Sequence, residues 1–200
     1  MLLPGTLLPL HIFEARYRAM VGDVLEGDRT IGMSLMKPGW EDGGRDPEVF
    51  PVGGAGEIVD SERMEDGRYN IVLQGRFRYR IVTESRTEPY RLAQVEPVVS
   101  LPFPDPQSAA RARASLTRLF AELTAPPELP PLPEEDLSAE RLASEIALRL
   151  RYAPPELQDL LEADSLQKRY EALAGRLRDW KRRLRFLEPF RPGELDPSRN

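Results

Sequence analysis

The sequence predicts an α+β protein in which a β-rich half precedes a helical half. Up to Leu101, short apolar runs alternate with turn residues, and the pair Asp66-Gly67 separates two of these runs. Such a pair is a strong hairpin signal, because glycine tolerates the positive φ that a tight turn requires. After Leu101, apolar residues recur every three or four positions, as in amphipathic helices. We therefore expect a β lobe over residues 1–101 and a helical lobe over residues 102–200.

One helix is expected inside the β lobe, over residues 13–25. Its apolar residues are spaced four, four and three apart and share one face: Phe13, Tyr17, Val21 and Val24. Glu14 and Arg18 are spaced for an acid-to-base pair on the same helix. Gly27 follows at the position where a helix commonly ends.

The strands of the β lobe are expected at residues 30–36, 57–64, 69–73 and 90–99. Residues 76–81 add a strand in which apolar residues alternate with arginines. This alternation predicts that Phe77, Tyr79 and Ile81 face the core and that the three arginines face solvent. Residues 37–48, rich in glycine and proline, are expected to form a long loop.

The helical lobe is expected to begin at Asp105-Pro106, an N-cap followed by proline in the first helical turn. Residues 126–133 contain five prolines and predict a stiff, extended connector. Helices are expected at residues 137–152 and, for a shorter stretch, from Pro154-Pro155 onward. The last helix is the most regular, with apolar residues alternately four and three apart: Leu166, Tyr170, Leu173, Leu177, Trp180, Leu184 and Leu187.

Charge is distributed unevenly, although the net charge is only -5. Residues 124–164 carry ten acids and three bases, whereas residues 165–187 carry eight bases and two acids. The basic last helix allows two interpretations. Either the helix binds nucleic acid, or its bases face the acidic segment 124–164 and solvent. The second is favoured because Tyr170 and Trp180 belong to the apolar seam, so the polar face has few aromatic residues with which to bind bases. The seam itself fits a coiled-coil dimer or, preferably, an intramolecular bundle.

Composition argues against most catalytic chemistry. There is no cysteine and one histidine, His11, so cysteine–zinc sites and Ser-His triads are excluded and no metal or cofactor is expected. The nearest approach to a phosphate loop, Gly22 to Gly27, continues with Asp28, which would repel phosphate. Three lysines are all on predicted polar surfaces, against Ser-Lys catalysis. The N-terminus lacks a basic region and no apolar stretch is long enough to span a membrane, so the cytoplasm is expected.

Three separated motifs of the sequence carry a family resemblance. Residues 8–18 read LPLHIFEARYR. This run resembles PLHIFEPRYR, the hallmark of the Lon protease N-terminal domain family, with Ala15 in place of the usual proline. Residues 57–75 resemble the family's second signature, an EIV…DGRYN hairpin that ends in glycine, and residues 77–81 match the strand that follows. Residues 157–169 resemble the segment entering the family's long C-terminal helix.

The resemblance implies a PUA-like β pseudobarrel followed by a helical lobe that ends in one long helix. It also implies a non-catalytic module that recognises unfolded or exposed protein segments, with a separate protease or chaperone as a further partner. RNA binding through the PUA-like lobe and the basic helix is the alternative. Family members usually begin with a strand upstream of the motif that Leu3-Pro4-Gly5 matches, so we expect either that the barrel lacks this first strand or that translation starts further upstream.

Two groups of residues are predicted to have a role, one in binding peptides and one in the structure of the domain. The favoured interpretation of the 13–18 cluster is structural, with Phe13 and Tyr17 in the core and Glu14 and Arg18 joining the helix to strands. The alternative is a partly exposed patch that contacts peptides, joined by aromatics near the junction of the lobes. The predicted peptide-binding residues are Trp40, Phe103, Phe13, Arg16 and Tyr17. The predicted structural signature is Pro9, His11, Glu14, Arg18, Asp66, Gly67 and Gly75.

Overall fold

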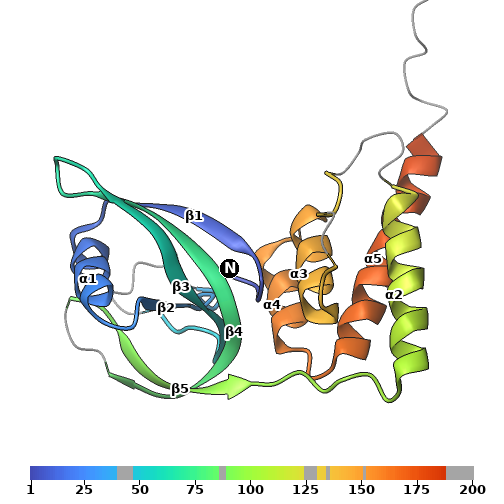
Figure 1. The fold of residues 1–200 in the computed structure, drawn as a ribbon, viewed down its shortest axis with the longest axis horizontal. Coiled ribbons are helices and arrows are strands. Elements are labelled where there is room, and N and C mark those ends of the chain that lie inside the picture. The colour runs from blue at the N-terminus through green and yellow to red at the C-terminus, as the bar shows by residue number, and fades with distance from the viewer. Residues whose placement is uncertain (40–46, 86–88, 124–129, 134–135, 151, 188–200) are drawn as a thin grey trace, which may run out of the picture.

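The computed structural model describes residues 1–39, 47–85, 89–123, 130–133, 136–150 and 152–187. Strands come first and helices dominate after them (Figure 1). The strands are β1 (Leu7–Ile12), β2 (Thr30–Met33), β3 (Val52–Arg63), β4 (Tyr69–Ser85) and β5 (Leu92–Val98). The helices are α1 (Ala15–Glu26), α2 (Pro106–Ala121), α3 (Ala139–Arg149), α4 (Pro154–Glu162) and α5 (Leu166–Leu187).

The described strands form one antiparallel, curved sheet in the order β1-β4-β3-β2, and β5 also pairs with β4 (Figure 1). The long strand β4 pairs with three other strands and so holds this sheet together. Its first half pairs with β1 and its second half with β5, while β3 runs along its other edge. The sheet and α1 enclose an apolar core that includes Val21, Ile31 and Leu73. The α+β class predicted from the sequence is confirmed.

Two strands are longer than the sequence predicts, and glycines explain why. β3 begins at Val52 and not at residue 57, and β4 runs through Gly75 without a break. The N-terminal segment crosses the sheet here. A Cβ atom on Gly75 would lie 2.1 Å from the carbonyl oxygen of Leu3, and one on Gly54 would lie 2.0 Å from that of Leu2. Glycine in a strand interior often marks such a close approach of backbone, so these glycines are part of the sheet.

The prediction that the arginines of residues 76–81 face solvent is wrong for Arg78. Its side chain is 1% exposed, and Phe77, predicted to be in the core, is 38% exposed. Tyr79 is buried as expected. The reason is tertiary: the helical lobe covers the face of β4 that bears Arg78 (Figure 1). An alternating pattern shows that a strand has two faces, but it does not show that a second lobe covers the polar one.

The helical lobe follows the sequence pattern closely. Asp105 caps α2 by accepting a hydrogen bond from the Ser108 backbone amide at 2.8 Å, and Ser138 caps α3 in the same way. The regular seam of α5 packs against α2 and α3, so the intramolecular bundle is confirmed as the arrangement of this seam. Leu3 and Val52 of the β lobe join the same core, and both lobes are thereby connected.

Half of the predicted proline-rich connector, residues 126–129, lies outside the described residues. The absence of a first family strand stays a prediction. Within the described residues, none of the helices combines the length and the apolar character that a membrane span needs.

Candidate functional site

Two aromatic side chains are exposed around the start of α1, Phe13 just before the helix and Tyr17 in its first turn. Phe13 is 63% exposed and Tyr17 is 36% exposed, whereas Val21, one turn further, is buried. Val24 packs on the β-lobe core as well. The apolar stripe of α1 therefore contacts the core only over the second half of the helix. The interpretation that Phe13 fills the core is wrong, and the structure favours the alternative of an exposed patch.

Arg16 covers one of these aromatic rings. Its guanidinium lies 4.5 Å from the ring centroid of Tyr17, within the range of a cation–π contact. Glu14 Oε2 holds the same guanidinium at 2.9 Å. The predicted Glu14–Arg18 pair is not formed, because Arg18 turns toward the hairpin and donates from Nη1 to the carbonyl oxygen of Asp66 at 3.3 Å. Arg18 thus joins α1 to the hairpin, which is the structural role expected for it.

His11, at the end of β1, lies beside Phe13 with ring centroids 6.3 Å apart and planes 25° from parallel. Its Nε2 is 3.1 Å from Arg68 Nη1, and its Nδ1 is 2.7 Å from Asn70 Oδ1. Arginine can only donate, so Nε2 accepts; Nδ1 then carries the proton and donates to Asn70. The ring is fixed from both sides by residues of β4 and the hairpin.

The hairpin between β3 and β4 completes this surface. Gly67 has a φ of +81°, as the Asp-Gly signal predicts. Asp66 pairs with Arg68 at 2.7 Å, and the hydrogen bonds from Arg68 lower the pKa of the Asp66 carboxyl. We name the surface formed by His11, Phe13, Arg16, Tyr17 and Arg68 the aromatic patch. It combines open aromatic area with two arginines, a composition that is enriched where proteins bind other proteins.

The other two predicted peptide-binding residues do not join this patch. Phe103 packs on the helical core, where its ring meets that of Tyr170 edge-on at 5.1 Å. α1 lies at the opposite end of the molecule from the helical lobe (Figure 1). The predicted combination of Phe103 with the first helix is therefore wrong. Trp40 lies outside the described residues.

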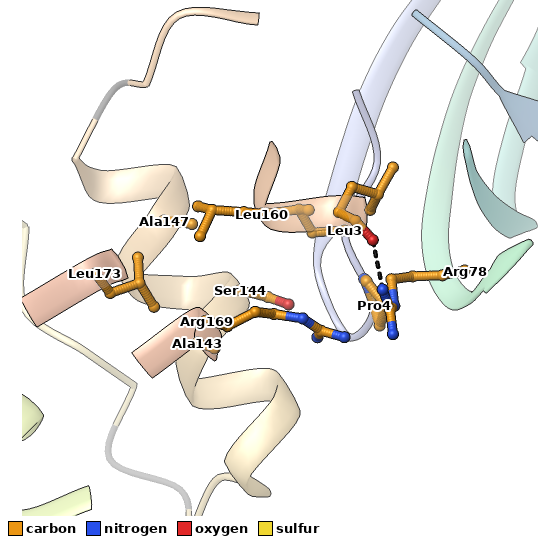
Figure 2. Close-up of a pocket in the computed structure, with 10 residues that line it drawn as sticks. Leu3, Pro4, Arg78, Ala143, Ser144, Ala147, Leu160, Arg169 and Leu173 are labelled. Atoms are coloured by element: carbon orange, nitrogen blue, oxygen red, sulfur yellow. Dashed lines mark hydrogen bonds between the residues drawn. The ribbon is translucent and has the colours of Figure 1, made fainter. Parts of the chain in front are cut away.

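A second polar cluster, which the sequence did not reveal, lies between the lobes. We name it the junction cluster: Arg78, Ser100, Glu140 and Arg169. Arg78 donates to the carbonyl oxygens of Leu161 and Ala163 at the end of α4, the second at 2.9 Å. Figure 2 shows Arg78 and Arg169 approaching from the two lobes.

Glu140 and Ser100 connect the two arginines. Glu140 Oε1 accepts from Arg169 Nη1 at 3.0 Å and from Ser100 Oγ at 2.8 Å. Ser100 in turn accepts from Arg169 at 2.7 Å and from Arg78 at 3.2 Å. Burial, and then the neighbouring Arg169, lower the pKa of Arg78 to about 10. Burial raises the pKa of Glu140, but the bonds from Arg169 and Ser100 outweigh it and leave that pKa lowered.

Residues 1–179 match the family model of the ATP-dependent protease La (LON) substrate-binding domain. The chain belongs to this family. The Lon protease of Dictyoglomus thermophilum is 30% identical over 192 residues, which are 92% of this chain. The Lon protease of Anaeromyxobacter dehalogenans is 26% identical over 171 residues, 83% of this chain. The chain spans only 23% and 20% of the lengths of these two proteins.

Two solved structures share the fold of this Lon-family chain. A Lon N-terminal domain protein from Xanthomonas campestris has a TM-score of 0.60 at 21% identity and covers 87% of this chain and 91% of its own. The N-terminal domain of a Mycobacterium avium complex Lon protease has a TM-score of 0.66 at 15% identity and covers 90% and 93%. The family resemblance drawn from the three sequence motifs is confirmed.

The basic helix α5 of this Lon-family chain pairs with acids. Arg176 contacts Glu156 at 3.0 Å, and Lys181 contacts Glu122. Arg169 binds Glu140 as described above. The interpretation that the bases of the last helix face the acidic segment 124–164 is confirmed for Arg169 and Arg176, whereas Glu122 precedes that segment. Paired bases offer little unbalanced charge for phosphate, so the RNA-binding alternative gains no support.

Proposed function

We propose that this Lon-family domain binds exposed segments of unfolded or misfolded proteins and catalyses no reaction on them. Membership of a family defined as a substrate-binding domain supports the proposal. The relatives are proteases of which this chain matches about a fifth. We propose that a protease or chaperone acts on what this chain binds, and that it does so in the cytoplasm.

The aromatic patch is the observation that carries this proposal. Unfolded chains expose apolar side chains without a fixed shape, so a surface that binds them needs accessible apolar area and no deep, specific pocket. Phe13 offers such area on a surface whose neighbours are already fixed. Glu14 holds Arg16 over Tyr17, and Arg68 and Asn70 hold His11. Pre-ordered contacts reduce the conformational entropy that binding would otherwise cost.

We propose binding through side chains and not through strand addition. β1 is an edge strand of the described sheet and lies beside the patch. Gly75 N–H donates to the carbonyl oxygen of Thr6, so the even-numbered residues of β1 direct their backbone groups to β4. Pro9 then falls on the free edge, where it has no N–H to offer. Proline on an edge strand opposes pairing with another chain.

The test is a fluorescence-polarisation titration of a labelled, permanently unfolded protein, such as reduced and carboxymethylated α-lactalbumin, with the full chain. Phe13→Ala should weaken binding by about thirtyfold, the effect of losing an aromatic anchor worth about 2 kcal/mol. Its Tm should stay near that of the wild type, because Phe13 is exposed.

Phe186→Ala is the matched control, since Phe186 is also an exposed phenylalanine, on α5. It should bind as the wild type does. Equal affinity of Phe13→Ala and the wild type would refute the role of the patch. Repeating the titration between about 50 and 500 mM salt separates apolar capture, which changes little, from phosphate binding to RNA, which weakens steeply.

A further inference from the structure

A small cavity of about 20 Å³ lies between the two lobes, at the junction cluster (Figure 2). Its lining includes Arg78 from β4, Arg169 from α5 and Ser144 from α3, together with apolar side chains such as Leu3 and Leu173. A volume of this size holds one particle about as large as a water molecule. The cavity is thus too small for an organic ligand and large enough for a monatomic ion.

The charges around this cavity do not balance. The side chains of Arg78 and Arg169 are 1% and 5% exposed, and Glu140 is the carboxylate that both approach. Asp164 also acts on Arg78, but Lys168 pairs with it at 2.8 Å. The three bases Arg78, Arg169 and Lys168 and the two acids Glu140 and Asp164 together leave one positive charge in excess. A buried charge without a counter-charge is strongly destabilising, so an anion here would be stabilised.

Each of the two arginines that line the cavity also has a buried hydrogen-bond donor without a partner. Neither Nε of Arg78 nor Nε of Arg169 is hydrogen-bonded to any described residue, although both atoms are buried. Arg78 Nε lies 4.0 Å from Glu140 Oε1, too far for a hydrogen bond. The hydroxyl of Ser144 already donates to the carbonyl oxygen of Glu140. Buried N–H groups without a partner are rare in proteins, and each therefore needs an explanation.

We propose that this cavity is a binding site for a halide-sized anion, held by the Nε–H groups of Arg78 and Arg169. An anion accepts from both donors and compensates the excess charge, and it needs no acceptor in return. A water molecule would accept the same two bonds, but it would leave the charge unbalanced. Because Arg78 belongs to the β lobe and Arg169 to the helical lobe, the bound anion joins the lobes. The site is independent of the aromatic patch and of what the patch binds.

The test compares the Tm of the full chain in sodium chloride and in sodium gluconate at equal ionic strength. Gluconate carries the same charge but is too large for the cavity. Chloride should raise the Tm in a saturable way, by about 3–6 °C when its concentration exceeds the Kd tenfold. Arg169→Lys, which keeps the charge but removes the guanidinium fork, should lose this rise. Arg182→Lys, an exposed position on the same helix, should keep it.

A second measurement locates the ion without any substitution. Crystals of the wild-type chain grown in sodium bromide should show an anomalous peak between the two Nε atoms. Coinciding chloride and gluconate curves together with no anomalous peak would overturn the proposal and leave water as the occupant. A chloride effect that Arg169→Lys retains, with the peak elsewhere, would also overturn it, because the anion would then act at another site. Should Arg169→Lys fail to fold, the bromide peak decides alone.

Discussion

Two arginine clusters stand at opposite ends of the β lobe and differ in one property, their access to water. In the aromatic patch, Arg68 and Asp66 form an ion pair whose side chains are 41% and 51% exposed. In the junction cluster, Arg78 is 1% exposed and reaches two backbone carbonyls of α4. Exposed pairs contribute little to stability, whereas a buried charge without its partners is strongly destabilising. The same residue types therefore fix the lobes at one end and leave a surface for a partner at the other.

The largest effect expected from this comparison is on stability at the junction. Arg78→Met should lower the free energy of unfolding by about 2–6 kcal/mol, because it leaves two carbonyl oxygens at the buried junction, those of Leu161 and Ala163, without their donor, at about 1–3 kcal/mol each. Arg68→Met should change it little, since Arg68 stands in solvent. Urea unfolding of both variants measures the difference. Equal losses would show that the two clusters are not distinguished by burial.

Two glycines sharpen the comparison with a smaller effect. Gly75→Ala should cost about 1–3 kcal/mol, the usual range for overpacking, since its Cβ would meet the backbone of Leu3. Gly67→Ala, in the hairpin beside the patch, should cost about 1 kcal/mol for its positive φ alone. Thermal unfolding of the two variants checks the order. A larger loss for Gly67→Ala would mean that the crossing of the N-terminal segment over the sheet is misplaced.

The smallest effect concerns pH. The pKa of Glu140 is lowered in the folded chain, so its contribution is present above the unfolded value of about 4.3 and is lost as the pH falls through the folded pKa. The stability gap between the wild type and Glu140→Gln should thus be constant near neutrality and narrow below about pH 4. Urea midpoints measured from pH 7 to pH 3 follow this gap. A gap that stays constant over the whole range would contradict the lowered pKa.

Elements that depend on local pattern could be predicted from the sequence. Three such elements depend only on residues close to them in the sequence: the seam of α5, the Asp105 cap of α2 and the Asp66-Gly67 turn. The structure has each of them at the predicted position. The motif around His11 also indicated the family. These features need no knowledge of what packs against them.

Features that depend on distant contacts could not be predicted. Arg78 and Arg169 are brought together by the packing of two lobes, and alternation along β4 indicated that Arg78 faces solvent. Phe13 shows the converse error. Its spacing with Val21 suits one helix face, but α1 begins only at Ala15, so Phe13 precedes the helix and the sheet beneath α1 does not cover it. Both errors concern what covers a surface, which is the property on which the candidate site depends.

Hydrogen–deuterium exchange of the full chain with and without the unfolded model protein tests the central claim most directly. Amides of the first turns of α1 and of the hairpin around Asp66 should become protected when the unfolded protein is bound, while those around Arg78 and Arg169 should not change. This result would place the bound segment on the aromatic patch. Protection at the lobe junction with none at α1 would contradict the account and return the binding site to the region between the lobes.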